Sequence, residues 1–147
     1  MKIDLTLLPV DSQLSGFELG DITLSHEGAE LTSADHQPSQ SMMIFIFLSD
    51  FLDLVLEIKK NSREATYRIT ATDSSFSLSL KKIGKEISIE NQNVKIVLPL
   101  EHFAQTLYSS IRDWLNPLKS RIDPTDSAMA DLLDTLDKYQ TAFEFRN

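Results

Sequence analysis

Residues 41–60 constrain the fold most, because their apolar side chains cover most of the circumference of a helix. Phe47, Phe51 and Val55 recur at helical spacing, and the leucines beside them widen the apolar stripe. A helix of this kind has to be buried between two layers of other elements. We predict one helix that starts near Met42. Its narrow polar side carries three carboxylates: Asp50, Asp53 and Glu57.

A second interpretation of this segment remains open. Residues 42–48 are apolar without interruption, so they also suit a short buried strand. Ser49 would then cap a helix that starts at Asp50. Both interpretations bury the segment, and the single helix is preferred.

Residues 65–98 alternate apolar and polar side chains in short runs separated by turn residues. The turns fall at 72–75, at Gly84 and at 91–93. Period-two runs with short linkers predict an antiparallel meander that has one packed face and one wet face. Its four strands are expected at residues 65–72, 76–80, 86–90 and 94–98.

The N-terminal 40 residues predict two strands and a loop. The first strand covers residues 2–8 and stops at Pro9. The second covers residues 16–25, where the alternation changes phase near Gly20 and suggests a β-bulge. The apolar residues of this second strand are Phe17, Leu19, Ile22 and Leu24. Residues 26–40 are polar and are expected to form a loop.

Two helices are expected after the meander. Pro99 suits the first turn of a helix over residues 100–118, which Pro117 should end. Asp123 followed by Pro124 predicts the cap and first position of the last helix. The apolar side of that helix carries Met129, Leu132, Leu133, Leu136, Tyr139 and Phe143.

The order of these elements predicts an α+β fold rather than an alternating βαβ fold. A β-β-α unit is followed by the four-stranded antiparallel meander and by two C-terminal helices packed on the sheet. A chain of 147 residues is long enough to bury a core, and we expect a single domain over residues 1–147.

Composition narrows the functional classes. The chain has no cysteine, which excludes disulfides, thiolate catalysis and zinc sites with sulfur ligands. Its formal charge of −8 disfavours nucleic acid and anionic membrane surfaces as partners. There is no signal-peptide pattern and no run long enough to cross a bilayer, so we expect a cytoplasmic location. We expect no cofactor and no metal.

The negative charge is concentrated in the first third of the chain. Residues 1–57 carry ten acidic side chains and one lysine, whereas residues 58–97 carry eight basic and four acidic ones. The acids are either a solvated surface balanced by the middle segment, or a patch that attracts a basic protein. If they form such a patch, the partner-binding residues are expected in or near exposed turns: Asp11, Glu18, Asp21, Glu27, Glu30 and Asp35.

Catalytic motifs are not visible in the sequence. The candidate bases are His26, His36 and His102, and no serine lies in a nucleophile-elbow motif. The four glycines form no phosphate-binding fingerprint. If the chain were an enzyme, it would use Asp50 or Asp53 with His102. We expect no catalytic residue.

Two short motifs and two helices resemble the bacterial immunity proteins of polymorphic toxin systems. The motifs are Phe47-Leu48-Ser49-Asp50-Phe51-Leu52-Asp53 and Thr72-Asp73-Ser74-Ser75-Phe76, followed by the helix with Trp114 and an Asp-rich last helix. The similarity spans about residues 42–140. It implies a protein without catalytic activity that binds one cognate toxin and covers its active or substrate-binding surface.

This resemblance leaves three alternatives. A secretion-type chaperone is also small, acidic and α+β, and it would usually be a dimer, whereas the oligomeric state of this chain does not follow from its sequence. A small enzyme and a purely structural subunit are the others. For the preferred interpretation, the partner is a protein with a basic toxin domain.

Overall fold

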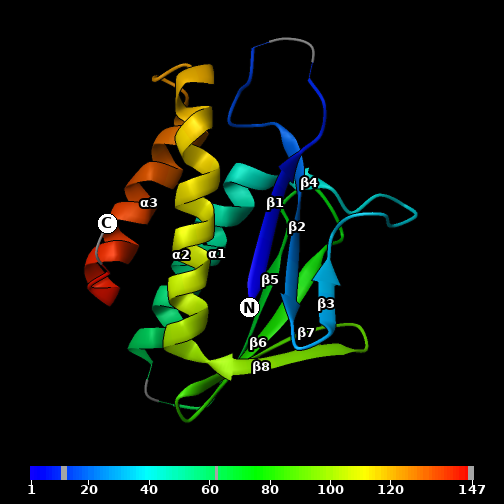
Figure 1. The fold of residues 1–147 in the computed structure, drawn as a ribbon, viewed down its shortest axis with the longest axis vertical. Helices are drawn as coiled ribbons and strands as arrows, with labels where there is room; N and C mark the ends of the chain where they lie inside the picture. The colour runs from blue at the N-terminus through cyan, green and yellow to red at the C-terminus, as the bar shows by residue number, and fades with distance from the viewer. Residues whose placement is uncertain (11–12, 62, 146–147) are drawn as a thin grey trace.

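The computed structural model describes residues 1–10, 13–61 and 63–145, and it is an α+β structure. Two antiparallel sheets lie on one side and the helices on the other (Figure 1). The first sheet contains β1 (Lys2–Leu7), β2 (Leu19–His26), β3 (Ala29–Thr32) and β4 (Met42–Met43). The second contains β5 (Thr66–Thr70), β6 (Ser77–Ile83), β7 (Glu86–Asn91) and β8 (Val94–Pro99). The helices are α1 (Ile44–Lys60), α2 (Leu100–Leu115), the 3₁₀ segment η1 (Asn116–Arg121) and α3 (Ser127–Phe143). The predicted fold class is confirmed.

Helix α1 lies at the centre of the core, as its apolar circumference predicts. It packs against α3 on one side and against β2 and β5 on the other. Met42 pairs with Gly20 and Met43 pairs with Leu19 in a two-residue strand, and the helix begins at the next residue, Ile44. The alternative strand over residues 42–48 is therefore wrong. Ser49 lies within the helix, where its hydroxyl donates to the carbonyl of Phe45 at 3.2 Å.

The second sheet is the predicted meander, in the order β5-β6-β7-β8. Its inner face aligns Leu80, Ile89 and Ile96 across three strands, and all three side chains are buried. Cross-strand apolar rows of this kind hold an antiparallel sheet in register. The helices cover this inner face, with α2 in contact with β7 and β8.

The first sheet corrects the expected bulge at Gly20. Every residue of β1 pairs in turn with one residue of β2, from Lys2 with Ser25 to Leu7 with Gly20, so no extra residue is inserted. The phase change has another cause: Leu19 lies on the outer face of the sheet, whereas Ile22 lies on the inner face. Glycine is required at position 20 because a Cβ there would meet the carbonyl of Thr6 and the side chain of Ile44.

The predicted loop over residues 26–40 is wrong in part, since it contains β3. Glu27 and Gly28 form the tight turn between β2 and β3, and both have positive φ angles, of 48° and 82°. Thr23 and Thr32 face each other across the two strands, with their hydroxyls 2.8 Å apart. The hairpin escapes a search for apolar alternation because β3 has only four residues and buries a single apolar side chain, Leu31.

The C-terminal helices bury the predicted apolar side but differ at their ends. Helix α2 ends at Leu115, and η1, which contains Pro117, follows directly. The cap of α3 is Asp126 and not Asp123: Asp126 Oδ1 accepts from the amide of Met129 at 2.9 Å. The hydroxyl of Tyr139 donates to Ala104 at 2.9 Å and joins α3 to α2. In the part of the chain that is described, no helix combines the length and the apolar character needed to cross a membrane.

Candidate functional site

Asp21 is not an exposed partner-binding residue. It lies in β2, its exposed fraction is 8%, and its carboxylate accepts hydrogen bonds from two serine hydroxyls. These are Ser33, at 2.8 Å, and Ser41, at 2.9 and 3.0 Å. The two serines flank residues 34–40, so Asp21 fastens this segment to the outer face of the first sheet. The prediction that Asp21 lies in or near an exposed turn is wrong.

Glu18 lies in the turn before β2 and is held there by its own neighbours. Its Oε2 accepts from the amide of Ser15 at 2.9 Å and from the Ser15 hydroxyl at 3.2 Å. The backbone carbonyl of Glu18 accepts from the amide of Ile44, at the first residue of α1. The side chain is half-buried, and its carboxylate stabilises the turn.

The acidic candidates do not all lie at one end of the first sheet. Glu27, Glu30 and Asp35 are exposed, as predicted, whereas Asp11 lies outside the described residues. Glu27 follows the last residue of β2 and Glu18 precedes the first, so the eight-residue strand separates them by roughly 26 Å. A partner that contacts the carboxylates at one end of the sheet would interact with those at the other end only through long-range electrostatics.

The enzyme alternative requires Asp50, Asp53 and His102 to converge. Lys59 Nζ lies 3.7 Å from a carboxylate oxygen of Glu101, which places the start of α2 beside the end of α1. Asp53 and Asp50 lie six and nine residues before Lys59, about 9 and 14 Å back along the helix axis. The structure therefore separates both aspartates from His102.

The two α1 aspartates are nevertheless perturbed electrostatically. Partial burial of its exposed side chain raises the pKa of Asp50, and the neighbouring Asp53 adds to the rise. Burial also raises the pKa of Asp53, which Lys138 of α3 opposes and Asp134 reinforces. Within the described ranges, no group of three or more histidine and carboxylate side chains has the arrangement of a metal site.

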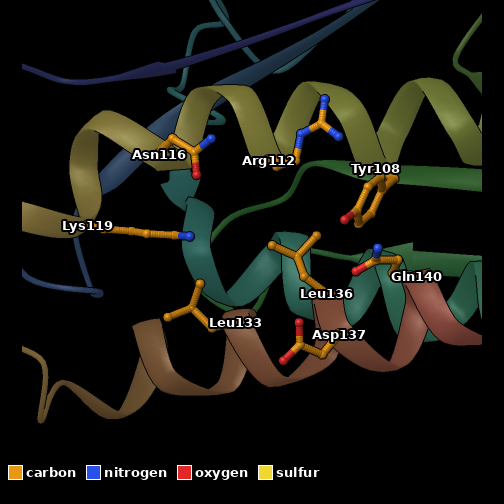
Figure 2. Close-up of a pocket in the computed structure, with 8 residues that line it drawn as sticks. All are labelled: Tyr108, Arg112, Asn116, Lys119, Leu133, Leu136, Asp137 and Gln140. Atoms are coloured by element: carbon orange, nitrogen blue, oxygen red, sulfur yellow. The ribbon is translucent and has the colours of Figure 1, made fainter. Parts of the chain in front are cut away.

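A groove of about 410 Å³ runs between α2, η1 and α3 (Figure 2). The lining residues are Tyr108, Arg112, Asn116, Lys119, Leu133, Leu136, Asp137 and Gln140. Arg112 donates to Asp113 at 3.1 Å, and its guanidinium carbon lies 5.6 Å from the centre of the Tyr108 ring. Neither Arg112 nor Lys119 belongs to a sequence motif, so the sequence does not indicate either one as a site residue. The mixture of leucines with charged side chains can hold a short amphipathic segment, but it provides no nucleophile beside a base.

Comparison with known proteins does not identify a family for this chain. No family model, curated protein or solved structure matches this chain. The resemblance to immunity proteins stays a prediction.

Among the residues that the structure describes, five large apolar side chains are exposed, and none of them was a predicted site residue. Ile83 and Val97 lie on the second sheet, whereas the other three lie at one end of the first sheet. Leu8, Phe17 and Leu19 have exposed fractions of 39%, 51% and 41%. The phase change near Gly20 was the sequence signal for two of them, since it separates Phe17 and Leu19 from the buried half of the strand. It was interpreted as a bulge and not as a change of face.

Proposed function

We propose that this chain is an acidic protein-binding domain without catalytic activity, an immunity protein that binds and neutralises a basic bacterial toxin domain in the cytoplasm. One observation carries the proposal. Within residues 1–10, 13–61 and 63–145, no carboxylate from the first 57 residues forms an ion pair with a lysine or arginine of residues 58–97.

Among the described residues, this arrangement leaves the carboxylates of the acidic first third without an ion pair to the middle segment. Several of its carboxylates are exposed, on the first sheet and on α1: Asp4, Glu27, Glu30, Asp35, Asp50, Asp53 and Glu57. The charge contacts within this part of the described chain are local: Lys2 pairs with Asp4, and His26 Nε2 lies 3.8 Å from a carboxylate oxygen of Glu27. An uncompensated acidic surface speeds the encounter with a basic protein, and the association rate falls as salt rises.

Co-expression with the product of the gene immediately upstream tests the proposal, because immunity proteins act on a cognate toxin. We expect gel filtration with light scattering to show a one-to-one complex. We also expect co-expression to restore the growth of cells that the toxin alone would arrest. Absence of a complex together with unrelieved growth arrest would contradict the proposal. A stable dimer that holds an extended effector segment would favour the chaperone alternative.

A charge-reversal variant tests the electrostatic part. The triple change Glu27→Lys, Glu30→Lys and Asp35→Lys alters exposed side chains and spares Glu18 and Asp21, which hold the fold. We expect a lower association rate at low salt and a smaller difference at high salt. A matched control makes the same change of charge on the exposed face of α3, at Asp131, Asp134 and Asp137. An equal effect in both triples would show that only net charge matters.

A further inference from the structure

Leu8, Phe17 and Leu19 lie at one end of the first sheet and are here called the Phe17 patch. The amide of Leu8 donates to the carbonyl of Leu19 at 2.9 Å, and Leu19 pairs with the half-buried Met43. Figure 1 shows the end of β1, the start of β2, the start of α1 and the start of α3 at this same end. Scattered exposed apolar residues are ordinary, but a cluster of them marks an interaction surface.

The turn that carries Phe17 is held on both sides. Leu14 is buried and forms a parallel bridge with Ile122. The amide of Gly16 donates to Asp126 Oδ2 at 2.9 Å, so the turn is bonded to the cap of α3. The amide of Phe17 donates to the Ser15 hydroxyl at 3.3 Å. An aromatic side chain on a fixed backbone loses little entropy on binding, which is the property of a pre-organised anchor.

Four carboxylates lie on the segments that are bonded to the turn and strands of the Phe17 patch: Glu18, Asp73, Asp123 and Asp126. Backbone amides or hydroxyls hold each of them in place. For example, both oxygens of Asp73 accept from the amide of Met43, at 3.1 and 3.2 Å. Hydrogen bonds from the hydroxyl and the amide of Thr125 lower the pKa of Asp123. In the described portion of the chain none of the four is in an ion pair, so their negative charge is not cancelled.

We propose that the Phe17 patch is the contact for a basic protein surface, with Phe17 as the anchor that enters an apolar pocket of that partner. This inference rests on the proposed function and locates its binding surface. An apolar centre within a polar rim is the usual arrangement of a protein interface, and aromatic side chains carry much of the binding energy. The uncancelled carboxylates of the rim select a partner whose own rim is basic.

The test measures the affinity of three variants for the upstream-encoded protein. Phe17→Ser removes the anchor, and we expect affinity to fall at least about 30-fold, the loss typical of a hot spot. Leu8→Ser is a second variant outside the turn and should weaken binding in the same direction. Ile83→Ser is the matched control, because Ile83 is 43% exposed on the second sheet. It should leave affinity within about twofold.

The outcomes separate this inference from the proposed function. Equal affinity of wild type, Phe17→Ser and Ile83→Ser would overturn the inference and leave the proposed function standing. No binding by the wild type would overturn both. If the wild type is a dimer and Phe17→Ser is a monomer, the patch binds a second copy of this chain. That result would also overturn the inference. Thermal unfolding of each variant confirms that the fold is retained.

Discussion

Replacing Asp21 with alanine should destabilise the protein strongly, because the Asp21 carboxylate accepts hydrogen bonds from two serine hydroxyls. The change removes the acceptor for the hydroxyls of Ser33 and Ser41. Ser33 is itself buried and also accepts from the amide of Ile22 at 3.0 Å, so it cannot turn toward water freely. The substitution therefore leaves at least one buried donor without an acceptor.

Two opposing effects determine how far the free energy of unfolding falls in Asp21→Ala. Hydrogen bonds to a charged group contribute about 1.5–3 kcal/mol each, and the half-buried Ser41 belongs at the lower end of that range. Removing a buried charge also removes its desolvation cost, which acts in the opposite direction. The two serine donors remain after the substitution, so we expect the loss of hydrogen bonds to outweigh the relief of desolvation. The free energy of unfolding should fall by about 3 kcal/mol.

Urea unfolding followed by far-UV circular dichroism measures this difference. With a slope of roughly 2 kcal/mol per molar urea, the midpoint should fall by about 1.5 M while the slope stays the same. Asp35→Ala is the control: Asp35 is exposed, and the change should alter stability by less than about 0.5 kcal/mol. Asp21→Asn keeps an acceptor oxygen and should lie between the two.

A midpoint for Asp21→Ala within error of the Asp35→Ala control would refute this reasoning. It would mean that the cost of burying the carboxylate equals the strength of its two hydrogen bonds. Hydrogen exchange gives an independent check, since the amides of residues 33–41 should lose protection first if Asp21 fastens that segment.

Three further changes have expected outcomes. Gly16→Ala places a Cβ against the carboxylate of Asp126 and should cost about 1–3 kcal/mol in urea unfolding; an unchanged midpoint would contradict the close approach. Tyr139→Phe removes the bond to Ala104 and keeps the ring, so it should cost about 1 kcal/mol, again by urea unfolding; a loss above about 3 kcal/mol would point to packing instead. Asp50→Asn should raise the free energy of unfolding at pH 7, because burial raises the pKa of Asp50 and the folded state holds its charge less well than the unfolded state. Thermal melts should show this gain disappearing as pH falls through the raised pKa and below 3.8, where the carboxyl is protonated in both states; a gain that persists in acid would refute the assignment.

Much of the fold could be predicted from the sequence because its apolar periods are strong. The wide stripe of α1 and the alternation of the meander each permit few arrangements, and both were predicted. The hairpin of β2 and β3 was not, because β3 has four residues and contributes a single buried side chain, Leu31. The cap of α3 was misplaced by three residues. Asp126 also binds the amide of Gly16, and that tertiary contact is invisible to a local cap signal.

The candidate site was less predictable, since proximity in sequence does not determine which face a carboxylate occupies. Asp21 and Glu18 are three residues apart, yet the first holds a loop against the sheet and the second stabilises a turn. Phe17 and Leu19 are exposed because the pairing of β2 with β1 determines which residues around Gly20 face the core and which face outward. Only the exposed positions of Glu27, Glu30 and Asp35 follow from the turn chemistry around them.

The bond between Gly16 and Asp126 also governs when the Phe17 patch forms during synthesis. These two residues are separated by 110 positions, so the turn cannot be fastened until the start of α3 has left the ribosome. At ordinary elongation rates this delay is about 5–20 s, during which the turn that carries Phe17 is not yet bonded to α3. A chain truncated before Asp126 would therefore keep most of its acidic residues and still lack the bond that holds this turn.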